Sequence, residues 1–139
     1  MPTNEVFLDT SYAIALASPK DQYHTRAEAL ADELEQSRSR LVTTRAILLE
    51  IGGSLARQRF RSAAVELLDS LESDSTVEII PLSESLYVRA LRLYRERPDK
   101  EWSLTDCVSF IVMQDRGLTE ALTTDNHFRQ AGFRALLLE

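Results

Sequence analysis

Short apolar runs alternate with longer amphipathic segments along the 139 residues of the chain. Brief apolar runs bounded by polar or turn residues are typical of buried strands, whereas apolar positions three and four residues apart are typical of amphipathic helices. The pattern predicts five strands, at residues 6–8, 41–43, 77–80, 119–123 and 133–138. It predicts helices around residues 18–34, 44–55, 60–71, 83–94, 102–116 and 125–131.

Capping residues help to place several helix ends. Ser18-Pro19-Lys20-Asp21 offers an N-cap serine, a proline at the first helical position and an acid three residues after the cap, which predicts a helix that begins there. Thr43 or Thr44 can cap the helix that follows the second strand. Gly117 is expected to end the very apolar helix before the fourth strand, because glycine is favoured just after the last helical residue.

Strands that alternate with helices indicate a parallel sheet, because a parallel connection must cross over the sheet and a helix covers the crossing. We therefore expect an α/β fold, a three-layer α/β/α sandwich. The length suits one domain, residues 1–139, and there are no internal repeats or linkers. Hydrophobic residues make up 44% and charged residues 27%, a globular balance.

Several classes of protein are disfavoured by the sequence. The single cysteine, Cys107, excludes an internal disulfide and a cysteine-based zinc finger, and its apolar helical setting indicates a core residue. No signal peptide or membrane-length apolar run is visible, so we expect a soluble, cytoplasmic protein with no membrane partner. The phosphate-binding motif GxxxxGK[ST] and the nucleophile elbow GxSxG are both missing, which argues against an NTPase and a serine hydrolase.

Four acids stand at or just beyond the ends of predicted strands. Asp9 closes the first strand, Glu50 lies about two turns into the helix after the second, Asp106 lies in the first turn of the apolar helix, and Asp125 follows the fourth strand. Ligands of open parallel sheets bind at the carboxyl ends of the strands. Carboxylates gathered there repel one another unless cations are present, and Mg²⁺ prefers carboxylate oxygens together with waters and phosphate oxygens. The spacing therefore predicts a divalent-metal site that handles phosphate.

Each acid also has a plain structural interpretation that the spacing leaves open. Asp9 and Asp125 can be helix N-caps, and Glu50 can be a solvated helix residue. Asp106 is the most ambiguous, because Ser103 three residues earlier completes a capping-box pattern. The metal site is favoured over these separate interpretations, because the predicted topology brings all four acids to one end of one sheet.

Four motifs, in order, resemble the signature of PIN domains, and most closely the VapC-type toxin ribonucleases of toxin–antitoxin pairs. They are Phe7-Leu8-Asp9-Thr10-Ser11, the lone Glu50, Trp102-Ser103-Leu104-Thr105-Asp106-Cys107 and Leu122-Thr123-Thr124-Asp125-Asn126-His127-Phe128. The resemblance covers essentially the whole chain.

The resemblance implies a five-stranded parallel sheet of order 3-2-1-4-5 and Mg²⁺- or Mn²⁺-dependent cleavage of RNA that leaves a 5′-phosphate and a 3′-hydroxyl. It makes Asp9, Glu50, Asp106 and Asp125 the catalytic, metal-binding acids, positioned by hydrogen bonds from nearby hydroxyl groups. The candidates for those hydroxyls are Thr10, Ser11 and Thr123. It also implies a cognate antitoxin protein and a homodimer.

One position departs from the family pattern. Many PIN domains have a further acid two residues after the last aspartate, where this chain has His127. This departure favours a structural or solvent-facing histidine over a metal contact and leaves a role near phosphate open. Asp99 and Lys100, in the loop before Trp102, are weaker candidates for approach to the site.

The prediction is thus a metal-dependent endoribonuclease, the toxin of a toxin–antitoxin pair. The formal charge of −6 does not exclude an RNA partner, because arginines gather around Arg57 and Arg89 and can hold the RNA backbone. Two alternatives stay open: a metal-dependent phosphatase or phosphoacceptor domain, and a PIN-like module that binds without catalysis. Ser11 counts against the phosphatase, which would have an aspartate there, and the presence of all four acids counts against the binding module.

Overall fold

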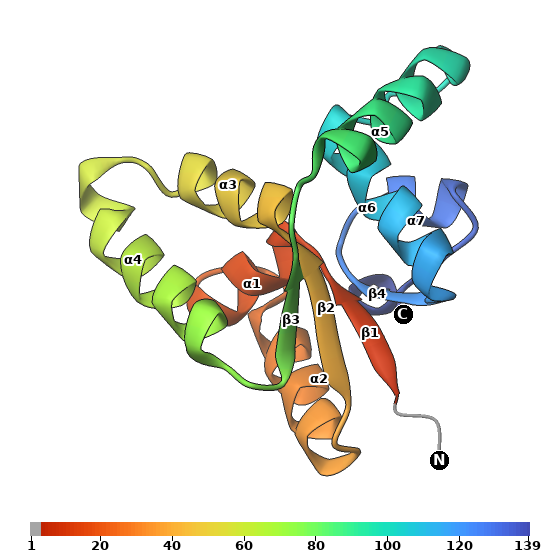
Figure 1. Ribbon diagram of the computed structural model, residues 1–139. Helices are drawn as coiled ribbons and strands as arrows, with labels where there is room; N and C mark the ends of the chain where they lie inside the picture. The colour runs from red at the N-terminus through yellow and green to blue at the C-terminus, as the bar shows by residue number, and fades with distance from the viewer. Residues whose placement is uncertain (1–3) are drawn as a thin grey trace.

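Five parallel strands form one sheet in the order β3-β2-β1-β4-β5 (Figure 1). The structure is a computed structural model in which residues 4–139 are described. The strands are β1 (Glu5–Leu8), β2 (Arg40–Thr44), β3 (Val77–Ile80), β4 (Glu120–Leu122) and β5 (Arg134–Ala135). In the central strand, Phe7 pairs with Val42 on one side and with Ala121 on the other. The predicted sheet and its strand order are confirmed.

Helices cover both faces of this sheet. They are α1 (Thr10–Ala17), α2 (His24–Gln36), α3 (Arg45–Ser54), α4 (Gln58–Ser73), α5 (Glu84–Glu96), α6 (Leu104–Arg116) and α7 (Asn126–Gln130). The first four pack in one group, and α5 to α7 lie on the opposite side of the sheet (Figure 1). The predicted three-layer architecture is therefore correct. None of the described helices is long and apolar enough to cross a membrane.

The start of the second helix was predicted wrongly. Ser18 is the C-cap of α1, a helix that the pattern did not predict, and its backbone N–H donates to Ile14 O at 2.9 Å. Residues 18–23 are turns, in which the Asp21 carboxylate accepts a hydrogen bond from the Tyr23 N–H at 2.8 Å. The serine and proline therefore end one helix, and α2 begins at His24.

The fifth strand is also shorter than predicted. Only Arg134 and Ala135 pair with β4, and Leu136–Leu138 form a 3₁₀ helix whose first two leucines are buried. β4 is also shorter than predicted and spans Glu120–Leu122, within the predicted 119–123. Buried leucines suit either structure, so the apolar run did not distinguish a strand from a helical turn.

Aromatic side chains lock α6 and α7 onto the sheet. Phe7, Phe110 and Phe128 are fully buried. The Phe110 ring stands edge-on to Phe128 and to Trp102, with 5.0 Å between ring centroids in both pairs. Truncating one of these phenylalanines to alanine would cost about 3–5 kcal/mol. This packing fixes the first turns of α6 and α7 at the carboxyl end of the sheet.

Candidate metal centre at the carboxyl ends of the strands

Asp9 lies at the end of β1, where the chain leaves the middle of the sheet. Its backbone N–H donates to Leu122 O at 3.2 Å, which joins the ends of β1 and β4. Its carboxylate accepts hydrogen bonds from the Thr123 hydroxyl at 2.7 Å and the Ser11 hydroxyl at 3.3 Å. Although Asp9 occupies the N-cap position of α1, its side chain makes no capping hydrogen bond. The interpretation of Asp9 as a plain cap is therefore wrong.

The environment of Asp9 opposes its ionisation. Only 6% of the residue is exposed. Burial raises the pKa of Asp9 to about 7, the hydrogen bond from Thr123 opposes that rise, and the charges of Glu50 and Asp106 add to it. A buried carboxylate that is repelled by two other carboxylates is stabilised when a cation is bound beside it.

Two hydroxyl groups tie the Asp9 side chain to the end of β4. The Ser11 and Thr123 hydroxyls lie 3.3 Å apart. Ser11 also accepts from the Thr124 N–H, and Thr123 from the Asp125 N–H, each at 3.0 Å. The predicted positioning by Ser11 and Thr123 agrees with these contacts, whereas the buried Thr10 hydroxyl has no partner among residues 4–139.

Asp106 both caps its helix and faces the other acids. Ser103 and Asp106 form a complete capping box at the start of α6, in which the Asp106 Oδ2 atom accepts from the Ser103 N–H at 3.0 Å. The same oxygen accepts from the His127 ring at 3.1 Å. Burial raises the pKa of Asp106, and the charge of Asp125 raises it further. Capping and metal binding are therefore compatible, because capping engages only Oδ2.

Asp125 has the same double position. It is the N-cap of α7, where its Oδ1 atom accepts from the His127 N–H at 2.8 Å. Among residues 4–139, the hydrogen bonds to Asp125 fall on Oδ1 and those to Asp106 fall on Oδ2. Each carboxylate thus keeps its second oxygen for a ligand.

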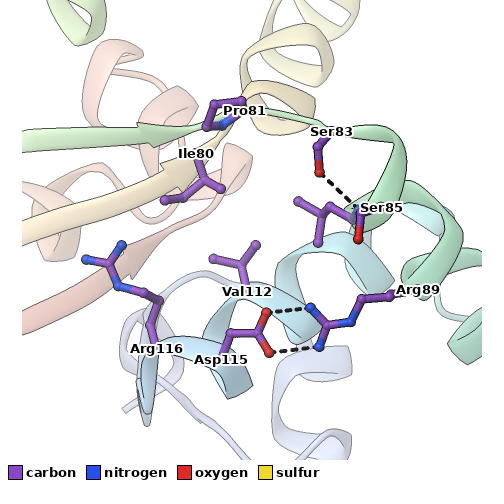
Figure 2. A pocket seen from close by; sticks show the side chains of 9 residues that line it. Ile80, Pro81, Ser83, Ser85, Arg89, Val112, Asp115 and Arg116 are labelled. Carbon is purple, nitrogen blue, oxygen red and sulfur yellow. Dashed lines mark hydrogen bonds and ion pairs between the residues drawn. The ribbon is translucent and has the colours of Figure 1, made fainter.

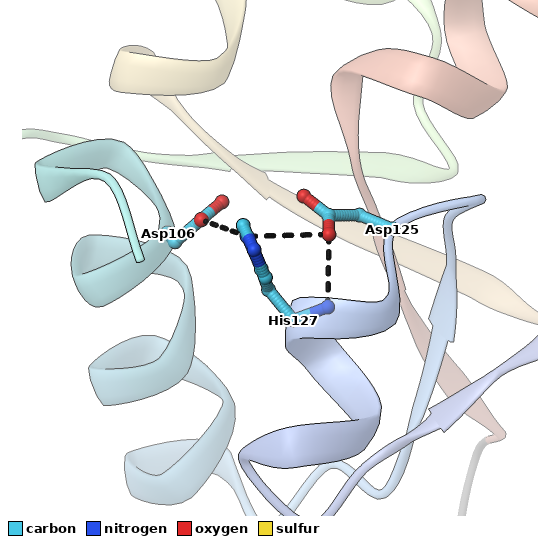
Figure 3. A group of neighbouring side chains, drawn as sticks. All are labelled: Asp106, Asp125 and His127. Carbon is cyan, nitrogen blue, oxygen red and sulfur yellow. Dashed lines mark hydrogen bonds and ion pairs between the residues drawn. The ribbon is translucent and has the colours of Figure 1, made fainter. Parts of the chain in front are cut away.

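His127 lies between these two aspartates (Figure 3). Its Nδ1 atom is 3.1 Å from Asp106 Oδ2 and 3.3 Å from Asp125 Oδ1. One ligand atom from each of the three residues lies within 4.8 Å of the other two, close enough to share one metal ion. These contacts agree with a structural histidine, one of the two interpretations that the sequence favoured. The signal in the sequence was the two-residue spacing from Asp125 in the first turn of a short helix.

Glu50 completes the acidic group from the opposite layer of helices. It is half-buried on the second turn of α3, whose N-terminus is capped by the Thr44 hydroxyl at 3.2 Å from the Ile47 nitrogen. Its charge raises the pKa of Asp9, so it is not a solvated surface residue remote from the site. The structure thus brings Asp106, Asp125 and His127 into one close group, and Asp9 and Glu50 lie near it without belonging to that group.

This donor set fits a divalent cation. Within residues 4–139, no lysine or arginine forms an ion pair with any of the four acids. Carboxylate oxygens suit hard cations such as Mg²⁺ and Mn²⁺, and an imidazole nitrogen favours the softer transition metals. A bound cation would relieve the repulsion that the pKa shifts of Asp9 and Asp106 reveal.

Other candidate residues lie outside this centre. Asp99 is exposed and forms a two-pronged pair with Arg97, at 3.0 and 2.9 Å. Cys107 is buried, and burial raises the pKa of its thiol to about 11, which suits a core residue and not a nucleophile.

A three-layer parallel fold with acidic side chains at the carboxyl ends of its strands places the chain among the open α/β domains that bind ligands at this edge of the sheet. The model of the PIN domain family matches residues 6–134. The chain therefore belongs to the PIN domain family.

Relatives agree with this assignment. The chain is 27% identical to the 23S rRNA-specific endonuclease VapC20 of Mycobacterium tuberculosis over 128 residues, which cover 92% of the chain and 95% of the relative. The crystal structure of M. tuberculosis VapC20, described as a sarcin-ricin loop cleaving toxin, matches with a TM-score of 0.81 over the same shares. FitAcB from Neisseria gonorrhoeae matches with a TM-score of 0.64 at 22% identity, covering 94% of each chain, which supports the fold alone.

Proposed function

We propose that this protein is a divalent-metal-dependent endoribonuclease and the toxin of a type II toxin–antitoxin pair, with its activity contained in one domain. The observation that carries the proposal is the close group of Asp106, Asp125 and His127 at the carboxyl end of a PIN-domain sheet, with the buried Asp9 carboxylate at the end of β1 beside it. A phosphodiester is the substrate that such a centre would suit, because the cation holds phosphate oxygens and carboxylates hold the cation.

The relatives supply the chemical identity of the substrate. VapC20 is named an RNA endonuclease, and the chain covers 95% of its length. Similarity on this scale supports RNA as the substrate, and ribosomal RNA is the first RNA to test. It also supports a small antitoxin partner and a homodimer, which we include in the proposal.

Under this proposal the four acids and His127 have distinct tasks. Asp9, Glu50, Asp106 and Asp125 would hold Mg²⁺ or Mn²⁺, and His127 would orient Asp106 and Asp125 through its Nδ1 atom. When bound, the metal would supply Lewis acidity to the scissile phosphate. The Ser11 and Thr123 hydroxyls would hold Asp9 in its ionised form by hydrogen bonds.

Expression and cleavage together test the proposal. Production of the chain alone should arrest growth of a bacterial host, whereas Asp9→Asn at equal protein level should not. The purified wild type should cleave ribosomal RNA with Mn²⁺ or Mg²⁺ and stop when EDTA is added. Equal toxicity of the two forms, or cleavage indifferent to EDTA, would contradict the proposal.

A further inference from the structure

A hollow of about 520 Å³ opens between the end of α5 and the start of α6. Its walls include three basic side chains, one acid, a tyrosine and the serine that caps α6: Arg95, Arg97, Lys100, Glu101, Tyr94 and Ser103. The volume lies within the range of sites that bind small ligands, roughly 300–1,000 Å³.

The hollow borders the first turn of α6, the turn that also carries Asp106. Ser103 lines the hollow, and its backbone N–H donates to Asp106 Oδ2 at 3.0 Å. Cys107, the residue after Asp106, lines it as well, whereas none of the four acids does. An RNA strand bound at the carboxylates would therefore reach the hollow by crossing the first turn of α6.

Two of the three basic residues in the hollow are available to a ligand. Arg97 is already engaged, since it pairs with Asp99 and lies over the Trp102 ring at 5.1 Å. No carboxylate of residues 4–139 forms an ion pair with Arg95 or Lys100. Their positive charge beside an acidic rim, in a chain of net charge −6, is suited to an anionic chain that leaves the rim.

The other two arginines of α5, Arg89 and Arg92, do not line this hollow. Arg89 faces a separate hollow and forms a two-pronged pair with Asp115, at 2.6 and 2.8 Å (Figure 2). Arg92 is exposed on the same helix as Arg95 and does not line the hollow at the α5–α6 junction. The structure thus separates Arg95 from the other arginines gathered around Arg89, and places it with Lys100, which the sequence offered as a separate candidate.

Tyr94 adds an aromatic surface at the mouth of the hollow. It is 49% exposed although it is a large hydrophobic residue. An exposed ring beside free cations is the combination with which proteins hold single-stranded nucleic acid, since bases stack on the ring while cations contact phosphates.

We propose that this hollow holds the single-stranded RNA that flanks the scissile phosphate. Arg95 and Lys100 contact backbone phosphates, and Tyr94 stacks against one base. This inference rests on the proposed nuclease function and assigns the direction in which the substrate leaves the metal centre. These residues set the affinity for RNA and do not touch the reacting phosphate, so they act on KM and not on kcat.

The test measures RNA affinity in the full chain made inactive by Asp9→Asn. Fluorescence anisotropy reports the Kd for a labelled RNA hairpin with a mixed-sequence loop, over a range of salt concentrations. The double substitution Arg95→Gln with Lys100→Gln should raise Kd at least about 10-fold and lower the salt slope by about 1.4, near 0.7 for each phosphate that is no longer neutralised. The matched control Arg92→Gln should stay within about twofold of its parent.

Three further substitutions, compared with one another, give a pattern that a general loss of structure cannot imitate. Glu101→Gln removes the one carboxylate of the lining and should tighten RNA binding. Tyr94→Ala should weaken binding by roughly 5-fold or more, whereas Tyr94→Phe, which keeps the ring, should not. In the active protein, the double variant should raise KM and leave kcat within about twofold of the wild type.

The outcomes separate the two proposals. A wild type that cleaves RNA, with a double variant whose Kd and salt slope equal those of its parent, would overturn the docking site and leave the nuclease standing. A double variant that weakens binding no more than Arg92→Gln does would overturn it equally. A wild type that neither binds nor cleaves RNA would overturn both.

Discussion

Acids at the two ends of the sheet differ in whether a basic residue pairs with them, and helix α6 contributes a residue at each end. At its C-terminus, Arg116 pairs with Glu78 at 2.8 Å and with Glu5 at 3.0 Å. At its N-terminus, Asp106 joins a group of acids that has no arginine or lysine partner among residues 4–139. Hydrogen bonding to Arg116 lowers the pKa of Glu78, whereas burial raises the pKa of Asp9 to about 7.

This difference distinguishes acids whose charge stabilises the folded state from acids whose charge destabilises it. The acids at the amino ends of the strands are compensated within the protein. Those at the carboxyl ends are held together by packing, capping and hydroxyl hydrogen bonds, and their repulsion is left for a ligand to relieve. Local destabilisation of this kind is typical of functional sites.

The largest expected effect is the loss of RNA cleavage when an acid at the carboxyl ends of the strands is replaced. Asp106→Asn should reduce RNA cleavage by ~1,000-fold or more, because a metal contact contributes several kcal/mol to the transition state. Its unfolding free energy should fall by only ~0.5–1 kcal/mol, since asparagine still suits a helix start.

The control at the other end is Glu78→Gln, which should cleave within about twofold of the wild type. Single-turnover cleavage and urea unfolding measure both quantities. An Asp106→Asn variant that cleaves at the wild-type rate would make this residue a cap and nothing more.

The two ends should also respond oppositely to pH in the metal-free protein. The folded pKa of Asp9 lies above its unfolded value of 3.8, so its ionisation lowers stability progressively as the pH rises from about 4 to about 7. The unfolding free energy of Asp9→Asn should therefore rise by about 2–3 kcal/mol relative to that of the wild type as the pH increases from 5 to 8.

Glu78 provides the contrast, because its folded pKa lies below 4.5 and its stabilisation is lost only as the pH falls through that pKa. The difference between Glu78→Gln and the wild type should stay constant from pH 5 to pH 8. Urea unfolding in chelator at both pH values measures these differences, and an Asp9→Asn advantage that does not grow with pH would refute the account of Asp9.

Removing the arginine that pairs with the acids at the amino ends should have a smaller effect on the unfolding free energy. Arg116→Met leaves Glu5 and Glu78 without their partner and should lower the unfolding free energy by about 1–2 kcal/mol, a discounted value because the arginine side chain is 30% exposed. Arg134→Met is the matched control, since the Arg134 side chain is 58% exposed in its pairs with Glu120 and Glu139, and it should lower the unfolding free energy by less than Arg116→Met does. Equal losses in thermal unfolding would remove the distinction.

The smallest effect concerns His127. His127→Asn should weaken Mn²⁺ binding about 10-fold, because the imidazole orients two of the metal-binding carboxylates. His24→Asn should leave the Mn²⁺ affinity unchanged, since His24 contacts Ala15 O and Glu28 instead. Isothermal titration compares the two, and equal affinities would assign His127 a purely structural role.

Much of this architecture follows from the sequence. The order of apolar runs predicted the strands, and the carboxyl-end rule predicted that Asp106 and Asp125 would lie together. The ambiguity of Asp106 and Asp125 between cap and ligand had no sequence solution, because the structure lets one carboxylate do both. A pattern of capping residues does not show whether the second oxygen of the same carboxylate also binds a metal ion.

Other features depend on tertiary packing. The sequence does not show which side chains His127 meets, and its place depends on Phe128, whose ring packs against Phe110 of α6. Ser18-Pro19 resembles a helix start, but the preceding helix α1 uses the serine as its C-cap. The last apolar run contains a two-residue strand and a 3₁₀ turn, and its buried leucines suit either structure.

Thermal unfolding with and without metal tests the central claim most directly. Metal at 100 times its Kd stabilises the folded state by about 2.7 kcal/mol, which for a chain of this size should raise Tm by roughly 5–15 °C. Wild type should melt higher in Mn²⁺ than in chelator, whereas Asp9→Asn should melt no lower than wild type in chelator and respond less to Mn²⁺. A wild type whose Tm is the same in Mn²⁺ and in chelator would contradict the proposal that the four acids form a metal centre.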